Sequence, residues 1–254
     1  MTRKPFLLCT LILCSFILPA EKKHIKVYLI GDSTMCIFDP HRAPLTGWGM
    51  PFAYFFDSTV TIDNRAIGGR STRTFLSEGR WQPVADSAQK GDYVFMQFGH
   101  NDEATTGKMK VNYTSVPDYK INLIKFITET RAKQATPVLI TPVTRCQFNA
   151  DGTARESHLP YTNACIEIAS QFQVPLIDLD KKSRLLLQKL GPENAKLLFL
   201  MTAPGESPAY PAGISDSTHY NDYGARIIAE IVLSSIKDLN LELSERIAGP
   251  VKIN

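Results

Sequence analysis

The sequence predicts an α/β protein: a three-layer α/β/α sandwich with a flavodoxin-like, mostly parallel, five-stranded central sheet. Short runs of β-branched and apolar residues recur along the chain, and the segments between them are long enough for crossover helices. Several of these segments space their apolar residues for one buried helical face. Because crossovers between parallel strands are right-handed, helices should cover both faces of the sheet.

The first predicted strand is the run HIKVYLI, residues 24–30, which stops at Gly31. The other predicted strands cover residues 60–62, 93–98, 138–141 and 174–179. In open parallel sheets the ligand crevice lies at the carboxyl ends of the strands. The loops that follow these runs should therefore carry the chemistry.

The clearest helical pattern covers residues 117–133, where Pro117-Asp118 begins a segment with one apolar face. Further helices are predicted over residues 159–171, 180–190 and 222–239. With 254 residues the chain fits one domain, and residues 147–157 have the composition of a surface loop insertion.

Charge and composition argue against two classes of function. The chain has 28 Lys and Arg against 25 Asp and Glu, and no run of five or more basic residues. A nucleic-acid partner requires a basic patch or stripe, so we expect none. With 44% hydrophobic and 21% charged residues, the composition is that of a globular protein and not of a membrane bundle.

The first twenty residues have the pattern of a secretory signal peptide. Arg3 and Lys4 precede an apolar run over residues 6–18, and the charged segment of the mature chain begins directly after Ala20. We expect residues 1–20 to be a signal peptide and residues 21–254 to form a single domain. The predicted location is secreted or periplasmic.

Two other interpretations of this N-terminus are weaker. A membrane anchor needs about 20 apolar residues, and the run over residues 6–18 is shorter. A lipid-attachment cysteine normally follows a small residue, whereas Cys14 follows Leu13. We therefore expect no stable membrane insertion after cleavage.

The mature chain keeps an odd number of cysteines: Cys36, Cys146 and Cys165. A Cys146–Cys165 disulfide and three buried thiols are both compatible with this spacing. Neither the cysteines nor the histidines (His41, His100 and His158) lie at metal-ligand spacing. We expect no metal and no cofactor.

Ser33 is the candidate nucleophile, because it lies directly after the first predicted strand, at the mouth of the expected crevice. A serine in such a place is also a common turn or cap residue. The chain has no G-x-S-x-G elbow, so the α/β-hydrolase arrangement is not indicated. The case for Ser33 depends on its partners.

Those partners lie near the other end of the chain, where Asp216 and His219 are three residues apart on one predicted loop. A serine attacks only when a base takes its proton, and the imidazole needs an acceptor at its other nitrogen. His219 is the candidate base and Asp216 the candidate acceptor.

Acyl transfer also needs donors for the oxyanion, and the loss of one donor costs about 3 kcal/mol of barrier. After the second predicted strand, Gly69 is preferred to Gly68 as a backbone donor, since glycine allows close approach. After the third predicted strand, the side-chain amide of Asn101 can donate without carrying charge.

Together these segments resemble the blocks of the SGNH (GDSL-type) hydrolase superfamily, and within it the rhamnogalacturonan acetylesterase group. The matching segments are Gly31–Met35, Gly47–Gly49, Gly68–Ser71, Phe98–Asp102 and Asp216–Asn221. The resemblance spans essentially the whole mature chain. It implies the three-layer fold with an active site at the strand ends.

Residue by residue, the resemblance implies that Ser33 is the nucleophile, His219 the general base and acid, and Asp216 its orienting partner. It implies that Gly69, Asn101 and the backbone N–H of Ser33 form the oxyanion hole.

The resemblance also implies an acetylated pectin as substrate. Arg70 and Arg73 lie beside the oxyanion loop, and we expect their guanidinium groups to bind galacturonate carboxylates. The competing expectation is that they are solvated or paired with Glu78 or Asp102.

Two alternatives stay open. The same scaffold could hydrolyse lipid or lysophospholipid acyl esters, because the catalytic blocks recognise the ester and not its chain. The chain could also be a secreted glycan-binding module without activity. The expected partner in the preferred interpretation is an acetylated polysaccharide or oligosaccharide.

Overall fold

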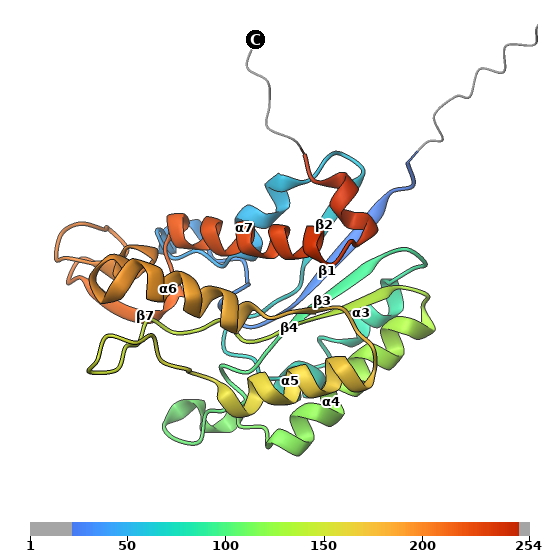
Figure 1. The fold of residues 1–254 in the computed structure, drawn as a ribbon, viewed down its shortest axis with the longest axis horizontal. Coiled ribbons are helices and arrows are strands. Elements are labelled where there is room, and N and C mark those ends of the chain that lie inside the picture. The colour runs from blue at the N-terminus through green and yellow to red at the C-terminus, as the bar shows by residue number, and fades with distance from the viewer. Residues whose placement is uncertain (1–21, 249–254) are drawn as a thin grey trace, which may run out of the picture.

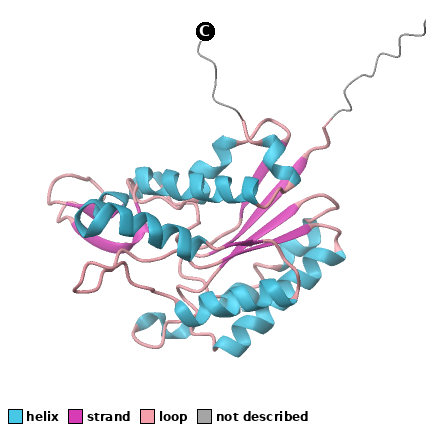
Figure 2. Ribbon diagram, in the orientation of Figure 1, coloured by secondary structure: helices cyan, strands magenta, loops and turns pink. Residues whose placement is uncertain are grey.

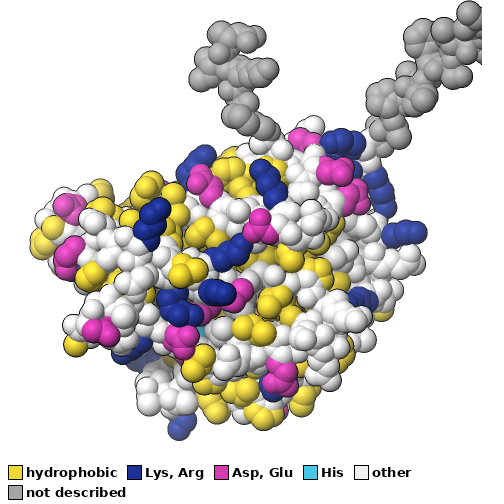
Figure 3. All heavy atoms as spheres, viewed as in Figure 1, with side chains coloured by type: hydrophobic (Ala, Val, Ile, Leu, Met, Phe, Trp, Pro, Cys, Tyr) yellow, Lys and Arg dark blue, Asp and Glu magenta, His cyan; other side chains and the backbone are white. Residues whose placement is uncertain are grey.

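The computed structural model describes residues 22–248. The signal peptide predicted over residues 1–20 lies outside this range. Within residues 22–248, no helix is long and apolar enough to cross a membrane. On the face viewed in Figure 3, basic and acidic side chains are interspersed.

The central sheet has five parallel strands in the order β2-β1-β3-β4-β5, so the predicted fold class is confirmed. The strands are β1 (Ile25–Gly31), β2 (Val60–Asn64), β3 (Tyr93–Gln97), β4 (Thr136–Ile140) and β5 (Leu176–Ile177). In this order the chain leaves β1 toward β2 and then returns to β3 on the other side. The loops after β1 and β3 therefore diverge, and a crevice opens between them.

Helices cover both faces of the sheet (Figure 1). One layer contains α1 (Gly49–Phe52), α6 (Leu179–Ala195) and α7 (Asp222–Asp238), and the other α2 (Thr72–Ser77), α3 (Gln82–Ser87), α4 (Val116–Ala132) and α5 (Leu159–Gln171). Short 3-10 helices are η1 (Pro40–Arg42), η2 (Ala53–Phe55), η3 (Lys108–Asn112), η4 (Lys196–Leu198) and η5 (Glu242–Arg246).

Most predicted elements differ from their predicted lengths by no more than two residues, and two differ by more. The strand expected over residues 174–179 is only the two-residue β5. The helix expected over residues 180–190 continues to Ala195 with a break at Gly191, where φ is +74°. Glycine adopts this conformation without strain, and the following Pro192 starts a new helical turn.

A two-stranded antiparallel sheet was not predicted. It consists of β6 (Phe199–Thr202) and β7 (Ile214–Tyr220) and lies apart from the central sheet (Figure 2). Asp216 and His219 lie within β7 and not on a loop. The backbone N–H of Thr46 donates to the carbonyl of Tyr220 at 3.0 Å, which ties this hairpin to the body of the protein.

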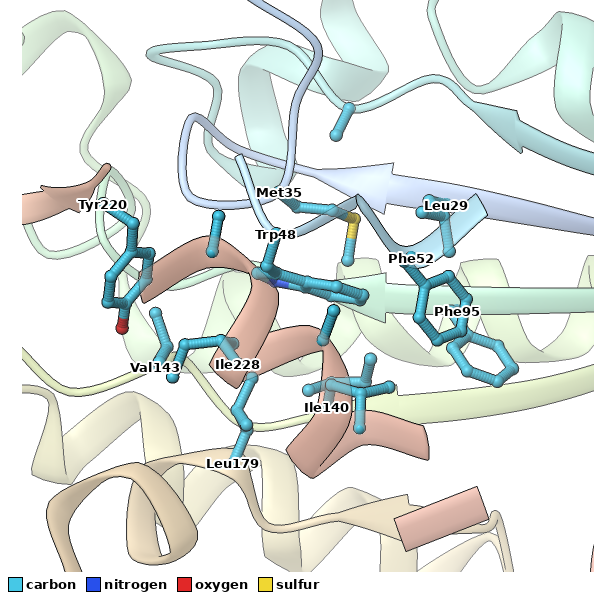
Figure 4. Close-up of a cluster of buried hydrophobic side chains, with 14 of the residues drawn as sticks. Leu29, Met35, Trp48, Phe52, Phe95, Ile140, Val143, Leu179, Tyr220 and Ile228 are labelled. Carbon is cyan, nitrogen blue, oxygen red and sulfur yellow. The ribbon is translucent and has the colours of Figure 1, made fainter. Parts of the chain in front are cut away.

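The larger hydrophobic core lies under α7 and is centred on Trp48, whose side chain is fully buried (Figure 4). Met35, Phe52 and Ile140 surround the indole in this view. Tyr220 lies at another edge of the same cluster, so the end of β7 is anchored in the core. Trp48 is therefore a core residue, as expected for an aromatic side chain in a domain of this size.

The described cysteines are free thiols. Cys165 is buried in the core on the α4–α5 side of the sheet, whereas Cys146 packs against the core on the other side. A sheet layer separates them, so the disulfide that the spacing allowed does not form between these positions.

Candidate active site

The structure brings Ser33, His219 and Asp216 together, although Ser33 and His219 are 186 residues apart in the chain. The Ser33 Oγ lies 2.8 Å from His219 Nε2, and the His219 Nδ1 lies 2.7 Å from Asp216 Oδ2. With the proton on Nδ1 donated to the carboxylate, Nε2 is free to accept the proton of the serine hydroxyl. This arrangement can activate a serine for attack on a carbonyl.

A buried chain of side-chain hydrogen bonds lies beneath Ser33. Trp48 Nε1 donates to Gln97 Oε1 at 2.7 Å, and Gln97 Nε2 donates to Thr34 Oγ1 at 2.7 Å. The Thr34 hydroxyl donates to Asp32 Oδ1 at 2.8 Å. These bonds join the loop after β1, the end of β3 and the segment before α1, and so they fix the turn that presents Ser33.

The Gly-Trp-Gly block has a packing explanation in the same place. A Cβ atom at Gly47 would lie 2.1 Å from the carbonyl oxygen of Cys36, and one at Gly49 would lie 2.5 Å from that of Met35. Only glycine allows the backbone of this segment to pack directly against the loop that carries Ser33. The block therefore supports the nucleophile loop from below.

His219 is positioned by the residues that follow it. Tyr220 is 1% exposed and fills the core, while Asn221 caps α7 by accepting the N–H of Gly224 at 2.9 Å. A Cβ at Gly224 would lie 1.9 Å from the carbonyl oxygen of Leu198, so α7 begins in direct contact with the backbone before β6. His219 is thus held between a buried ring and a helix N-terminus.

Asp216 is held as a carboxylate. Burial alone would raise its pKa, but the hydrogen bond and charge of His219 and two backbone N–H donors outweigh burial and lower the pKa to about 2. Those donors are the N–H groups of Thr218 and His219, at 2.8 and 3.1 Å from Oδ1. The acid is therefore ionised and oriented toward the imidazole at neutral pH.

The predicted oxyanion donors flank Ser33. Gly69, with φ of +78°, and Asn101 both line the same cleft as Ser33 and His219. The Asn101 amide donates one N–H to the carbonyl of Arg70 at 3.1 Å, which leaves its second N–H available. A Cβ atom added at Gly68 would lie 3.6 Å from the Cβ of Ser33. The glycine loop therefore lies directly against the serine.

The cleft above these residues has a volume of about 700 Å³. Its lining is mostly polar or small, and its large apolar side chains are Phe38 and Met109. Arg42 and Arg145 are the arginines that line it within the described part of the chain.

Arg70 and Arg73 do not line this cleft, in contrast to the prediction that they meet substrate carboxylates. Arg70 pairs with Glu78 at 3.0 Å, the intramolecular pairing that was the competing expectation. Arg73 donates to the carbonyl oxygens of Tyr113 and Val111. It therefore anchors the loop after Asn101 that forms one cleft wall.

A polar network that the sequence did not reveal connects the two sides of the cleft. Arg145 donates to Thr218 Oγ1 on β7 and, at 3.2 Å, to Glu103 Oε1 on the loop after β3. The other oxygen of Glu103 lies 2.9 Å from Nδ1 of the fully buried His158, whose ring lies against that of His100. The strand of His219 and the loop of Asn101 are therefore cross-linked. No short motif marks this network, because its members are spread over two loops and strand β7.

Asp102 anchors the Asn101 loop from inside the protein. Its Oδ1 accepts the backbone N–H of Thr72 at 3.0 Å and the Thr72 hydroxyl at 2.6 Å. Burial raises the pKa of Asp102 to about 7, although the hydrogen bonds from Thr72 oppose that effect. The carboxyl ties the start of α2 to the loop after β3.

The chain is similar in sequence to known proteins. The family model of the GDSL-like Lipase/Acylhydrolase family matches residues 29–227. The chain is 39% identical over 228 residues to rhamnogalacturonan acetylesterase RhgT of Bacillus subtilis (strain 168), covering 90% of this chain and 96% of RhgT.

Solved structures agree with the fold. The structure of protein YXIM of Bacillus subtilis superposes with a TM-score of 0.73 at 26% identity, over 87% of this chain. This chain spans only 58% of YXIM. An Axe2 variant, an acetylxylan esterase from Geobacillus stearothermophilus, superposes with a TM-score of 0.61 at 18% identity, over 86% of this chain and 95% of Axe2.

Proposed function

The chain belongs to the GDSL-like lipase/acylhydrolase family, whose members are carboxylic ester hydrolases, and we propose that it removes acetyl esters from a pectic polysaccharide. The proposed substrate is rhamnogalacturonan above all, and the proposed reaction passes through an acyl-enzyme. The observation that carries this proposal is the contact of His219 with both Ser33 Oγ and Asp216 at a cleft. The substrate class is supported by the name and the high coverage of the relative RhgT.

In the proposed reaction, His219 Nε2 takes the Ser33 proton as Oγ attacks the acetyl carbonyl carbon. The imidazolium then gives that proton to the sugar oxygen as the ester C–O bond breaks, and acetyl-Ser33 remains. Water attacks this ester with His219 again as the base, which releases acetate and restores the hydroxyl. Asp216 stabilises the imidazolium in both halves.

The oxyanion that forms in each half is assigned to the N–H groups of Ser33 and Gly69 and to the free N–H of Asn101. Each is a neutral donor on a loop held by other hydrogen bonds, so little reorganisation is needed when charge develops. Asn101 is held by its bond to the Arg70 carbonyl.

The cleft lining favours a short acyl group over a lipid chain, which is the alternative on the same fold. A long acyl chain requires an extended apolar wall, and Phe38 and Met109 alone do not provide one. The non-catalytic alternative, a glycan-binding module, does not require a serine hydroxyl within 2.8 Å of an imidazole that contacts a carboxylate.

The test is acetate release from acetylated pectin, acetylated xylan and aryl esters by the wild type and by Ser33→Ala. We expect Ser33→Ala to lower kcat by at least about a thousandfold without a change in the thermal unfolding midpoint. The exposed Ser58 gives a control, Ser58→Ala, that should keep full activity. An octanoyl ester cleaved faster than the acetyl ester would favour the lipid alternative, and substantial activity of Ser33→Ala would remove Ser33 from the mechanism.

We also propose that residues 1–20 direct export and are removed. The charged and apolar pattern of this segment supports the proposal. Cell fractionation and N-terminal sequencing of the mature protein test it, and the expected first residue is Glu21.

A further inference from the structure

Arg42 differs from every other arginine within residues 22–248, because its guanidinium group has neither a hydrogen-bond acceptor nor a carboxylate partner. The other described arginines each donate to a carbonyl, an amide or a hydroxyl oxygen or pair with an acid. An arginine carries five donors that are always charged at physiological pH. Arg42 is therefore a cation with unused donors.

This cation lies on the wall of the cleft that contains Ser33 and His219. Its Cζ atom is 5.0 Å from the centre of the Phe38 ring, at cation–π distance. The Phe38 ring in turn contacts the His219 imidazole edge-on, with 6.3 Å between ring centres. The guanidinium and the imidazole therefore share a contact with the Phe38 ring.

The backbone that carries Arg42 is also held. Asp39 caps η1 by accepting the N–H of His41 at 2.8 Å. The Arg42 carbonyl accepts the hydroxyl of Tyr210, from the loop between β6 and β7, at 3.3 Å. The side chain thus extends from a fixed turn, which reduces the entropy lost when it binds a ligand.

The other arginine at the cleft has an acid partner. Arg145 pairs with Glu103, and the Asp216 carboxylate is held by His219. Among the described residues that line the cleft, Arg42 is the charge without a counterion. An anionic ligand group at this wall would meet an unopposed positive charge.

We propose that Arg42 forms a carboxylate-binding subsite, which holds the carboxylate of a uronic acid residue of the substrate close to the ester that is cleaved. This inference rests on the proposed acetylesterase function. It names Arg42 as the residue that makes the enzyme selective for acidic glycans. A guanidinium fork binds a carboxylate through two parallel hydrogen bonds, which a neutral sugar cannot offer. Methyl esterification of the uronate removes the charge and the second strong acceptor.

The kinetic experiment compares one acetylated acidic oligosaccharide with the same compound after methyl esterification of its carboxyl groups, and with an aryl acetate. Arg42→Ala should raise KM for the acidic substrate about threefold to tenfold, the range for one exposed ion pair with hydrogen bonds. The kcat should stay within about twofold, and both constants should be unchanged for the other two substrates. Arg42→Lys should keep part of the effect, because the charge remains and the fork is lost.

Arg226 provides a matched control. Its guanidinium also lies over an aromatic ring, 4.9 Å from the centre of Phe55, but on α7 and outside the cleft. Arg226→Ala should leave every KM unchanged. Equal losses of Arg42→Ala on the acidic, esterified and aryl substrates would show that Arg42 only shapes the loop, and unchanged constants on all three would equally overturn the subsite.

A binding measurement separates this inference from the proposed function. Calorimetric titration of the Ser33→Ala protein with a de-esterified acidic oligosaccharide reports the subsite without catalysis. Adding Arg42→Ala to the Ser33→Ala protein should weaken binding by the same threefold to tenfold. The affinity of the Ser33→Ala protein should fall more steeply with salt concentration than that of the double variant. Equal affinity with and without the arginine overturns the subsite, whereas failure of the wild type to release acetate from any glycan overturns the proposed function alone.

Discussion

Asp216→Asn is the sharpest single test of the relay between the carboxylate and the serine. The substitution keeps the shape of the side chain, and an amide oxygen can still accept the N–H groups of Thr218 and His219. It removes the charge that faces His219 Nδ1 at 2.7 Å. The change is therefore confined to the interaction that makes the imidazole a base.

The magnitude follows from the pKa of Asp216, which the folded protein lowers from 3.8 to about 2. At 1.36 kcal/mol for each pKa unit, the surroundings favour the carboxylate by about 2–3 kcal/mol. Asparagine keeps the backbone hydrogen bonds that account for part of this energy, so loss of the rest should lower kcat by up to about 30- to 150-fold. If the asparagine amide donates to Nδ1, the imidazole is held in the wrong tautomer, and the loss reaches about 10⁴-fold.

Stability should change in the same direction. The folded pKa of Asp216 lies below the unfolded value of about 3.9, so its contribution is present above that pH and disappears as the pH falls toward 2. Asp216→Asn should therefore lower the free energy of unfolding by about 1–2 kcal/mol at pH 7, where the asparagine keeps only the two backbone bonds. It should have little effect near pH 2.

The assay is kcat on an aryl acetate at a temperature at which the variant is fully folded by circular dichroism. Asp151→Asn is a matched control, since Asp151 Oδ1 accepts the N–H of Thr153 at 2.9 Å in an exposed turn with no histidine. That control should keep the wild-type kcat. A folded Asp216→Asn protein with kcat within about threefold of wild type would refute the role of the carboxylate.

Two further predictions concern the support of the site. Gly224→Ala should lower the free energy of unfolding by about 1–3 kcal/mol, measured by urea denaturation, because a Cβ there would lie 1.9 Å from the Leu198 carbonyl oxygen; unchanged stability would contradict this close packing. Asp102 has a folded pKa of about 7, above the unfolded value of about 3.9, so it binds its proton more tightly in the folded state and costs stability as the pH rises from about 4 to about 7. Asp102→Asn should make the free energy of unfolding less dependent on pH between pH 5 and pH 8, and the same pH dependence in both proteins would show that Asp102 titrates normally.

The features that the sequence predicted well are those written in short, local patterns. The strands that form the sheet are apolar runs ended by turns, and Ser33 follows one of them directly. The helix over Leu159–Gln171 has the predicted bounds. Gly69, Asn101 and the Asp-x-x-His segment could be proposed from the sequence because each belongs to a short segment of adjacent residues.

The hairpin that carries Asp216 and His219 could not be predicted in this way. Its strand β7 is ISDSTHY, in which polar residues dominate, so no alternation of apolar side chains indicates a strand. The strand exists because it pairs with β6 and because Tyr220 is anchored in a core built from distant segments. Pairing of this kind is a tertiary effect.

The arginines that line the cleft could not be predicted from the sequence, for a different reason. Arg70 and Arg73 are close to Gly69 in the sequence, but the direction of a long side chain depends on the acceptors that surround it. Glu78 and the Gly68 carbonyl bind the Arg70 guanidinium, and the carbonyl groups at the end of η3 bind that of Arg73, so both groups have acceptors within the protein. Arg42 reaches the cleft from a turn that contains no recognisable motif.

The division of the reacting groups between two sheets has a consequence for how the protein acquires activity. Ser33 lies on the loop after β1 of the central sheet, whereas His219 and Asp216 belong to the β6–β7 hairpin, whose contacts with the rest of the chain include those of Tyr220 and Thr218. A chain whose central sheet has folded while the hairpin is still undocked has a correctly placed hydroxyl and no base beside it. In the proposed mechanism, ester hydrolysis therefore begins only when the two sheets have assembled, and it reports that assembly step more directly than helix or strand content does.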